Sequence, residues 1–211
     1  MKEYKLPIGC DVPETIILAD GDFPSHPLAL EWLRQCPYVV CCDGAANTYI
    51  RSGRMLEAIV GDGDSLLPDI KERYASLIHS EAEQETNDLS KAFRFCLSQE
   101  RKRITIMGAT GKREDHTIGN VSLLADYMEQ AEVSMMTDYG IFVPIREDSM
   151  FESYIGQQIS VFNMNSTALS AEGLAYPLSV FTNWWQGTLN EALARHFIIR
   201  TEGKVLVFRV F

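Results

Sequence analysis

Four segments that combine aspartate with glycine each follow an apolar run that has the character of a buried strand. The segments are Asp20–Asp22, Asp43–Asn47, Gly61–Ser65 and Gly108–His116. In an open α/β sheet, ligands bind beyond the carboxyl ends of the strands. Glycine lets the backbone approach a ligand closely, and aspartate supplies oxygen ligands for hard cations. Any one Asp-Gly pair is most simply a turn, but four at one sheet edge indicate a shared polar site.

The segment Gly61–Ser65, with the sequence GDGDS, is the sharpest of these signals. Asp62 and Asp64 stand two residues apart on a glycine loop, so both carboxylates can face one cation. Mg²⁺ typically takes one or two carboxylates together with waters and substrate phosphates. The pattern therefore predicts a magnesium site, and a solvent-facing turn is the alternative interpretation.

A further aspartate lies at the start of a predicted helix. Asn87 has the residue type of an N-cap, and Asp88 falls in the first turn, where the helix dipole favours an anion. That structural role accounts for Asp88 by itself. The functional hypothesis adds that Asp88 reaches the same cation as Asp62 and Asp64. Lys91 can bind a phosphate or pair with Asp88, and a surface pair is the simpler interpretation.

The glycine loop that begins at Gly108 is a candidate phosphate site. Backbone amides in such a loop can bind phosphate oxygens, and Arg113 offers a bidentate guanidinium. The spacing of a Walker A loop is absent. Asp115 and His116 follow at the entry of the next helix, and His116 taken alone is more simply a structural hydrogen-bonding residue than a base.

The elements that must position these residues are predicted from apolar runs and helical periodicity. Continuous apolar runs indicate strands at Thr15–Ala19, Tyr38–Cys42, Ala58–Val60, Ile104–Met107 and Val133–Met136. Apolar positions at helical spacing mark helices over Leu89–Leu97 and through Ile118, Val121, Ala125 and Met128. The alternation predicts an α/β fold, with a mostly parallel, Rossmann-like sheet flanked by helices over residues 1–140.

After about residue 140 the pattern becomes strand-like throughout. The expected strands are Ile141–Ile145, Gln158–Phe162, Phe197–Arg200 and Val205–Val210. Residues 201–204 are predicted to form a hairpin turn between the last two. Thr188 and Glu191 have the spacing of a capping box that opens a short helix. We therefore expect a smaller, all-β, sandwich-like C-terminal domain over residues 141–211.

The composition limits the partners and the compartment. The 211 residues carry a formal net charge of −10, so the chain offers no broad basic face to nucleic acid. No apolar run reaches the length of a membrane span, and we expect no membrane partner. The cysteines form no Cys-x-x-Cys pair, which favours reduced thiols and a cytoplasmic protein. They are Cys10, Cys36, Cys41, Cys42 and Cys96.

Several motifs occur along the chain in a definite order. They are CDGAAN at Cys42–Asn47, GDGDS at Gly61–Ser65, ETNDLSKA at Glu85–Ala92, GATGKREDHTIGN at Gly108–Asn120, and GLAYPL and TN at Gly173–Leu178 and Thr182–Asn183. Each motif alone is weak, but the ordered set resembles the thiamine pyrophosphokinases over most of the chain. The resemblance implies an enzyme that transfers pyrophosphate from ATP to thiamine, giving thiamine diphosphate and AMP. It also implies a homodimer with the thiamine pocket between subunits.

The resemblance also implies a role for particular residues. It places Mg²⁺ on Asp62, Asp64 and Asp88. It places ATP and phosphate contacts on Asp43, Asn47, Lys91, Gly111, Arg113 and His116. It places thiamine contacts on Tyr176, Thr182, Asn183, Trp184 and Trp185, and leaves open which aromatic residue stacks on the ring. If the transfer needs a general base, Asp115 is the first candidate and His116 the second.

Three departures from the family pattern are present. Glu85–Asp88 reads Glu-Thr-Asn-Asp where Asp-x-Thr-Asp is frequent, which leaves the roles of Glu85 and Asn87 open. Lys112 stands where a second glycine is common. A Trp184-Trp185 pair follows the Thr-Asn motif, which predicts a reshaped ring-binding end.

Two other functions fit the same motifs. One is a pyrophosphokinase of the same architecture that acts on a hydroxymethylpterin, with an unchanged acidic set and a different ring-binding end. The other is a non-catalytic sensor of thiamine or nucleotide. The intact set of Asp62, Asp64, Asp88 and Arg113 argues against a sensor, which need not keep a metal site.

Overall fold

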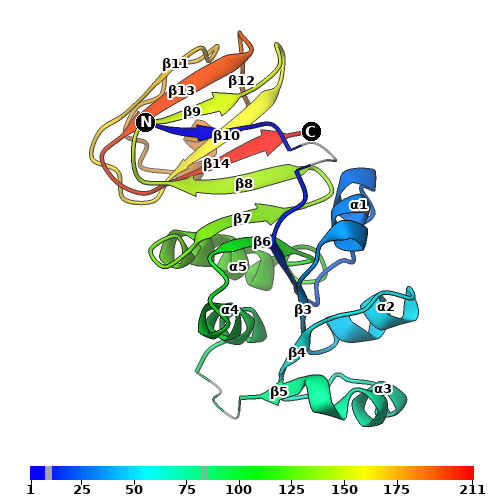
Figure 1. The fold of residues 1–211 in the computed structure, drawn as a ribbon. Helices are drawn as coiled ribbons and strands as arrows, with labels where there is room; N and C mark the ends of the chain where they lie inside the picture. Colours follow the sequence, from blue (N-terminus) through cyan, green and yellow to red (C-terminus); the bar gives the residue numbers. More distant parts are fainter. Residues whose placement is uncertain (8–10, 82, 84) are drawn as a thin grey trace.

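The computed structural model describes residues 1–7, 11–81, 83 and 85–211. Cys10, one of the cysteines, and Gln84, which precedes a predicted helix, lie outside the described residues. Within the described ranges, the chain forms a ten-stranded sheet, a four-stranded sheet and five α-helices (Figure 1).

The first part of the chain forms the parallel half of the large sheet. Its strands are β2 (Thr15–Leu18), β3 (Val39–Cys42), β4 (Ala58–Gly61), β5 (Ile78–Ser80), β6 (Arg103–Met107) and β7 (Glu132–Met136). They lie in the order β7-β6-β2-β3-β4-β5, and each neighbouring pair is parallel. The five predicted strands are confirmed to within one residue at each end. The short β5 was not predicted, because Ile78-His79-Ser80 has no apolar run to mark it.

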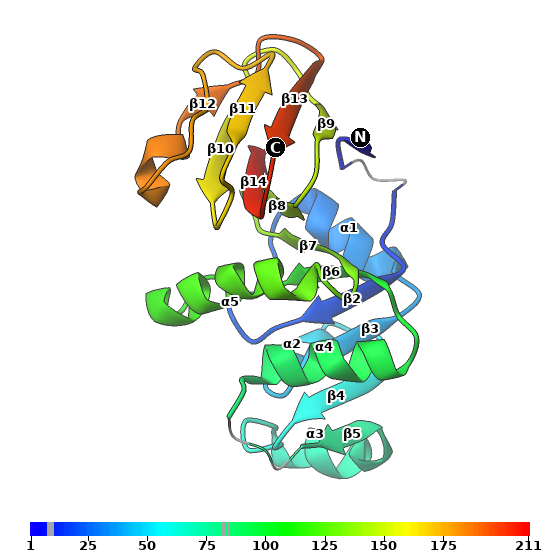
Figure 2. The same ribbon diagram turned by 90° about the vertical axis from the view of Figure 1, so that its left-hand side faces the viewer.

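Five helices cover the two faces of this half. They are α1 (Pro27–Gln35), α2 (Ala45–Arg51), α3 (Pro68–Arg73), α4 (Asp88–Ser98) and α5 (Glu114–Tyr127). Helices α4 and α5 pack on one face and α1, α2 and α3 on the other (Figures 1 and 2). Each face has its own apolar cluster, one containing Phe93 and Leu124, the other Trp32 and Tyr49. Coverage on both faces explains why β2, β3 and β4 are buried along their whole length.

The two predicted helices exist, and their predicted apolar faces pack against the core except at one position of the second helix. In α4 the predicted positions Leu89 and Phe93 are buried, and Asn87 caps the helix by accepting a hydrogen bond from Ser90 N at 3.0 Å. In α5 the prediction was wrong for Ile118, which is 59% exposed. The first turns of α5 project beyond the ends of the strands (Figure 2), so only the later turns meet the core.

The same sheet continues into the second part of the chain with antiparallel strands. These are β8 (Gly140–Ile145), β14 (Val205–Val210), β10 (Gln158–Asn163) and β12 (Asn190–Glu191). They follow β7 in the order β8-β14-β10-β12. The large sheet is therefore mixed, and the predicted parallel sheet is one half of it.

A second sheet covers the antiparallel half. It consists of β1 (Lys2–Tyr4), β9 (Ser149–Glu152), β13 (His196–Thr201) and β11 (Leu169–Glu172), in that order. An apolar cluster that includes Phe151, Phe197 and Val207 fills the space between the sheets. Strand β1 pairs in parallel with β9, so the first residues of the chain lie in this layer, beside the C-terminal strands (Figure 1).

Two local predictions for the second part were wrong. Residues 201–204 do not close a hairpin, because β13 pairs with β9 and β11 whereas β14 pairs with β8 and β10. This turn carries the chain from one sheet to the other. No helix begins at Thr188 either. A 3₁₀ helix, η2 (Trp184–Gly187), ends there, with Asn183 and Gln186 forming its capping box.

None of the helices in the described part of the chain is long and apolar enough to cross a bilayer. The thiols of Cys36, Cys41, Cys42 and Cys96 are free.

Arg209 on β14 ties the N-terminal strand to the body of the protein. Arg209 is only 2% exposed, and its guanidinium donates to the carbonyl oxygens of Glu152 and Lys5, both at 2.9 Å. The guanidinium also lies 5.1 Å from the ring centroid of Phe151. Burial lowers the pKa of Arg209 to about 10. A buried cation with main-chain acceptors on two segments fixes both of them in place.

We predict that Arg209→Met lowers the free energy of unfolding by about 2 kcal/mol, because two carbonyl groups in part-buried hydrogen bonds lose a charged donor. Urea denaturation measures the loss, and hydrogen exchange should show faster exchange at Lys2–Tyr4. The matched control is Arg200→Met, which removes an exposed arginine paired with Asp148 and Glu172. Equal losses in the two variants would contradict the anchoring role.

Candidate active site

The acidic glycine segments lie together at one edge of the large sheet. Strands β2, β3, β4 and β6 are parallel neighbours, so the loops that follow them leave the sheet on the same side (Figure 2). Backbone hydrogen bonds join the first and last of these loops, from Gly21 N to Gly108 O at 2.6 Å and from Asp22 N to Thr110 O at 2.9 Å. The predicted shared edge is confirmed.

Asp43 is the buried carboxylate of this edge. Asp43 is 4% exposed, and its φ of 31° is uncommon for a non-glycine residue. Oδ2 accepts a hydrogen bond from Ser65 N at 3.0 Å, whereas the buried Oδ1 has no hydrogen-bond partner among the described residues. Burial raises the pKa of Asp43, and the nearby carboxylates of Asp88 and Asp62 add to the effect.

Gly61 allows two carboxylates to approach each other. Its φ is 155°, and a Cβ there would lie 2.8 Å from Asp43 Cβ and 3.4 Å from Asp88 Cγ. A side chain at this position would push the two aspartates apart. Glycine is therefore required by the approach of Asp43 and Asp88 across the end of β4.

The loop with Asp62 and Asp64 is held from several directions. Asp62 Oδ1 accepts a hydrogen bond from Asp64 N at 3.1 Å, and Lys71 Nζ donates to Gly63 O at 3.0 Å. Asn47 donates to Ser65 O at 2.8 Å and accepts from Leu67 N at 3.0 Å. Both polar atoms of Asn47 are thus engaged with this loop, which gives it a positioning role that the sequence did not reveal.

Asp88 and Lys91 form an ion pair one helical turn apart. Lys91 Nζ lies 3.2 Å from Asp88 Oδ1. The pairing was predicted as a surface contact, but Lys91 is only 4% exposed. A buried ammonium group beside Asp88 partly balances the negative charge of the acidic edge.

The predicted phosphate loop leads directly into α5. Arg113 occupies the N-cap position, and its guanidinium binds Asp115 with two contacts, at 3.1 and 2.5 Å. This pairing lowers the pKa of Asp115 to about 2. A carboxylate with so low a pKa is a weak base, so the structure makes Asp115 less suited to proton abstraction than the sequence indicated. His116 is exposed on the same turn.

The predicted ring-binding residues form a separate group on the C-terminal part. Trp184 and Trp185 lie in η2 and are 41% and 73% exposed, and Tyr176 is 64% exposed. The backbone amides of Thr182 and Asn183 both donate to Gln186 Oε1, at 3.1 and 2.9 Å. This group lies at the same end of the molecule as the acidic loops (Figure 2). Within the described ranges, no hydrogen bond or ring contact joins the two groups.

The acidic edge offers oxygen ligands for a cation, although they are not gathered around one point. Among the described residues, no three His, Cys, Asp or Glu side chains are gathered closely enough to hold a metal ion. The unpartnered Oδ1 of Asp43, with Asp88 and Asp62 nearby, nevertheless fits a hard cation, because such a buried oxygen needs a positive partner. Carboxylate oxygens are ligands that Mg²⁺ takes in proteins, so the donor types at this edge fit that ion.

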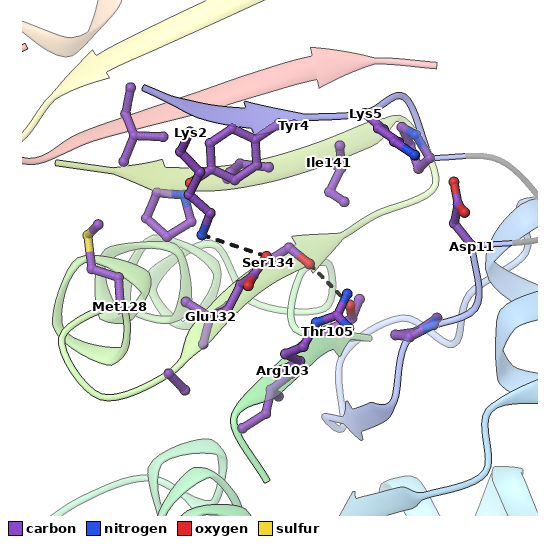
Figure 3. Close-up of a pocket in the computed structure, with 18 of the residues that line it drawn as sticks. Lys2, Tyr4, Lys5, Asp11, Arg103, Thr105, Met128, Glu132, Ser134 and Ile141 are labelled. Carbon is purple, nitrogen blue, oxygen red and sulfur yellow. Dashed lines mark hydrogen bonds and ion pairs between the residues drawn. The ribbon is translucent and has the colours of Figure 1, made fainter. Parts of the chain in front are cut away.

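A cavity of about 910 Å³ lies away from this edge. It opens at the amino ends of β6 and β7, under the N-terminal strand (Figure 3). Its floor includes Thr105 and Ser134, whose hydroxyl oxygens lie 3.1 Å apart, and Lys2 pairs with Glu132 across it. A smaller pocket of about 170 Å³ lies at the acidic edge and includes Asp20, Asp22, Thr48 and Lys112 in its lining.

Several residues at the edge were not assigned a role from the sequence. Lys112 Nζ lies 3.1 Å from Asp20 Oδ1, and the carboxylate of Asp22 packs against Gly111. The Asp20–Asp22 segment was visible as an acidic turn after a strand, which is the signal that could have found it. Lys71 carried no such signal, because it reaches the loop from the far end of α3.

Comparison with known proteins covers both parts of the chain. Residues 29–136 match the family described as "Thiamin pyrophosphokinase, catalytic domain", and residues 140–208 match "Thiamin pyrophosphokinase, substrate-binding domain". The chain belongs to the thiamin pyrophosphokinase family. The gap between the two matches falls between β7 and β8, where the large sheet changes from parallel to antiparallel pairing.

Individual members of the thiamin pyrophosphokinase family are similar over part of their length. Thiamine pyrophosphokinase 1 of Oryza sativa subsp. japonica is 29% identical over 129 residues, which cover 49% of each chain. Thiamin pyrophosphokinase 1 of Caenorhabditis elegans is 30% identical over 110 residues, 48% of this chain and 45% of the relative. The chain thus spans about half the length of the curated relatives it matches.

Solved structures from the thiamin pyrophosphokinase family share the fold. The thiamin pyrophosphokinase from Candida albicans superposes with a TM-score of 0.80 at 17% identity, covering 100% of this chain and 93% of that one. The enzyme from Bacillus subtilis gives a TM-score of 0.77 at 20% identity, covering 93% of this chain and 98% of that one. At these identities the likeness establishes the fold.

We predict that Asp43→Asn makes the protein more stable at pH 7. Because the pKa of Asp43 is raised in the folded state, the native protein loses stability as pH rises from the ordinary aspartate pKa through the raised one. Asparagine can still accept the hydrogen bond from Ser65 but carries no charge. Thermal unfolding should show a higher Tm for the variant at pH 7 and a difference that disappears below about pH 4. Asp126→Asn, an exposed control, should show no such pattern. A variant less stable than the unsubstituted protein at pH 7 would refute the prediction.

Proposed function

We propose that this chain transfers the pyrophosphoryl group of ATP to the hydroxyl of thiamine, giving thiamine diphosphate and AMP. The observation that carries the proposal is the match to both the catalytic and the substrate-binding domains of one family, in chain order. The acidic edge of the sheet supports it, because it supplies carboxylates for a cation beside a glycine loop suited to phosphate.

Asp62, Asp64 and Asp88 would hold Mg²⁺, and the ion would supply positive charge to the phosphate oxygens of ATP during the transfer to the thiamine hydroxyl. The buried, unpartnered Oδ1 of Asp43 would be a further oxygen ligand for the ion. Lys91 would hold the Asp88 carboxylate in position through their ion pair.

Phosphate positioning falls to the loop before α5. Arg113 lies at the N-terminus of α5, a position that favours anions, and its guanidinium would bind a phosphate oxygen there. Arg113 must release Asp115 to form a bidentate contact with phosphate. The exposed pair can exchange at little cost. Released Asp115 or exposed His116 then remains available to accept the hydroxyl proton, although positioning and electrostatics carry most of such a transfer.

Thiamine would bind at the C-terminal group. Tyr176, Trp184 and Trp185 present exposed aromatic surface, and Thr182 and Asn183 present polar groups beside it. The absence of a contact with the acidic loops within the described part of one chain supports a pocket completed by a second copy. We include the homodimer, a cytoplasmic location, and a division into an α/β domain over 1–140 and a β domain over 141–211 in the proposal.

The proposal is tested by incubating the purified protein with ATP, MgCl₂ and thiamine and separating the products by liquid chromatography. We predict equimolar AMP and thiamine diphosphate, and no product when EDTA replaces the metal. AMP formed only with a hydroxymethylpterin would identify the alternative substrate class, and ligand binding without AMP would identify a sensor. Either result overturns the proposed function.

We further predict that Asp64→Asn lowers turnover at least about 100-fold while the protein stays folded, because a metal-binding carboxylate is lost. The matched control is Asp69→Asn, which makes the same change of charge on an exposed aspartate in the first turn of α3. Circular dichroism checks the fold of both variants. Retention of more than about a tenth of the rate would remove Asp64 from the metal site.

A further inference from the structure

Lys112 occupies a strained position in the loop between β6 and α5. Its φ is 56°, in the left-handed region that glycine adopts freely and other L-residues adopt at a cost. The family pattern commonly has a glycine here, which would carry no such cost. A strained non-glycine residue persists where the surrounding structure holds it in place.

The loop around Lys112 is held in place by its neighbours. Two backbone hydrogen bonds join residues 108–110 to residues 21 and 22. Gly111 packs against the carboxylate of Asp22 so closely that a Cβ at Gly111 would overlap it. Lys112, the residue that follows Gly111, therefore carries the first side chain after the contact with Asp22, and this side chain can extend over the acidic edge of the sheet.

The partner of Lys112 in this structure is Asp20. Nζ and Oδ1 lie 3.1 Å apart, and the two side chains are 54% and 47% exposed. An ion pair this exposed contributes little to stability, so it can be exchanged for another contact readily. The other carboxylate oxygen of Asp20 lies against Gly44 at the start of α2, which holds Asp20 in place when the lysine moves.

A triphosphate that approaches this edge meets an excess of negative charge. Asp20, Asp22, Asp43, Asp62, Asp64 and Asp88 all lie on loops or helix ends there. Lys91 is buried with Asp88 and Lys71 donates to Gly63 O, whereas Lys112, like Arg113, is held by an exposed ion pair that can be exchanged. Lys112 also borders the pocket of about 170 Å³ between residues 19–23 and α2.

We propose that Lys112 is a nucleotide-positioning residue that leaves Asp20 when ATP binds and forms an ion pair with a phosphate oxygen instead. The exchange replaces an exposed contact by a charge-assisted hydrogen bond to a more highly charged group. It gives this chain a cation at a position where the family pattern has none. The inference rests on the proposed use of ATP.

The test compares Lys112→Gly with the unsubstituted protein. Glycine removes the cation and also relieves the backbone strain, so the variant should fold at least as stably. We expect the Kd of MgATP, measured by titration calorimetry, to rise about tenfold. The KM for ATP should rise in parallel, while the KM for thiamine and kcat stay within about twofold. Lys112→Arg should restore the affinity.

Two further variants make the test decisive. Lys102→Ala removes an exposed lysine at the opposite edge of the sheet and should leave the Kd of MgATP unchanged. Asp20→Asn removes the competing partner and should tighten MgATP binding. Lys112→Gly with a Kd within twofold of the original overturns the proposal, as does Asp20→Asn that weakens binding as much as Lys112→Gly. A protein that binds MgATP but makes no thiamine diphosphate would refute the proposed function and leave the calorimetric test intact.

Discussion

The repulsion among carboxylates at one edge of a parallel sheet is the constraint on which the rest of the site depends. Parallel strands bring their carboxyl ends together, so the loops after β2, β3 and β4 must place their aspartates side by side. Burial of Asp43 makes the conflict sharper, because its charge is removed from water while Asp88 and Asp62 remain near. Folding therefore stores unfavourable free energy in this edge, which a bound cation can recover.

The backbone holds this arrangement with conformations that few residues adopt. Gly61 and Gly111 allow carboxylates to pack where any side chain would collide with them, and Asp43 and Lys112 have positive φ values. Such conformations persist only where the scaffold over-determines them. Here the scaffold is a set of fully buried strands with an apolar cluster on each face. Each loop of the acidic edge begins where a buried strand ends, so the rigid core directly holds the strained backbone of the edge.

The sequence revealed those features that depend on local chemistry. Continuous apolar runs located β2, β3 and β6 because a strand covered on both faces must be apolar throughout. The Asp-Gly segments then followed from the ends of those runs. Pairings between distant segments were not visible. The sequence of Lys2–Tyr4 has no apolar run that marks a strand, yet these residues pair with β9. Likewise, no local sequence feature shows that residues 201–204 lead from one sheet to the other. The double hydrogen bond of Asn47 and the burial of Lys91 likewise depend on tertiary packing.

The continuity of the large sheet determines how the acidic loops and the aromatic group of the C-terminal part are held relative to each other. From the acidic edge, β-ladders run without interruption from β2 through β6, β7, β8 and β14 to β10. Gly187 of η2 packs directly against the carbonyl of Val161 on β10, and Trp184 contacts Phe162 edge-on. The aromatic group is thus fixed to the same sheet as the aspartates rather than carried on a hinged domain. The shared sheet therefore fixes the separation of the aromatic group and the aspartates within one chain.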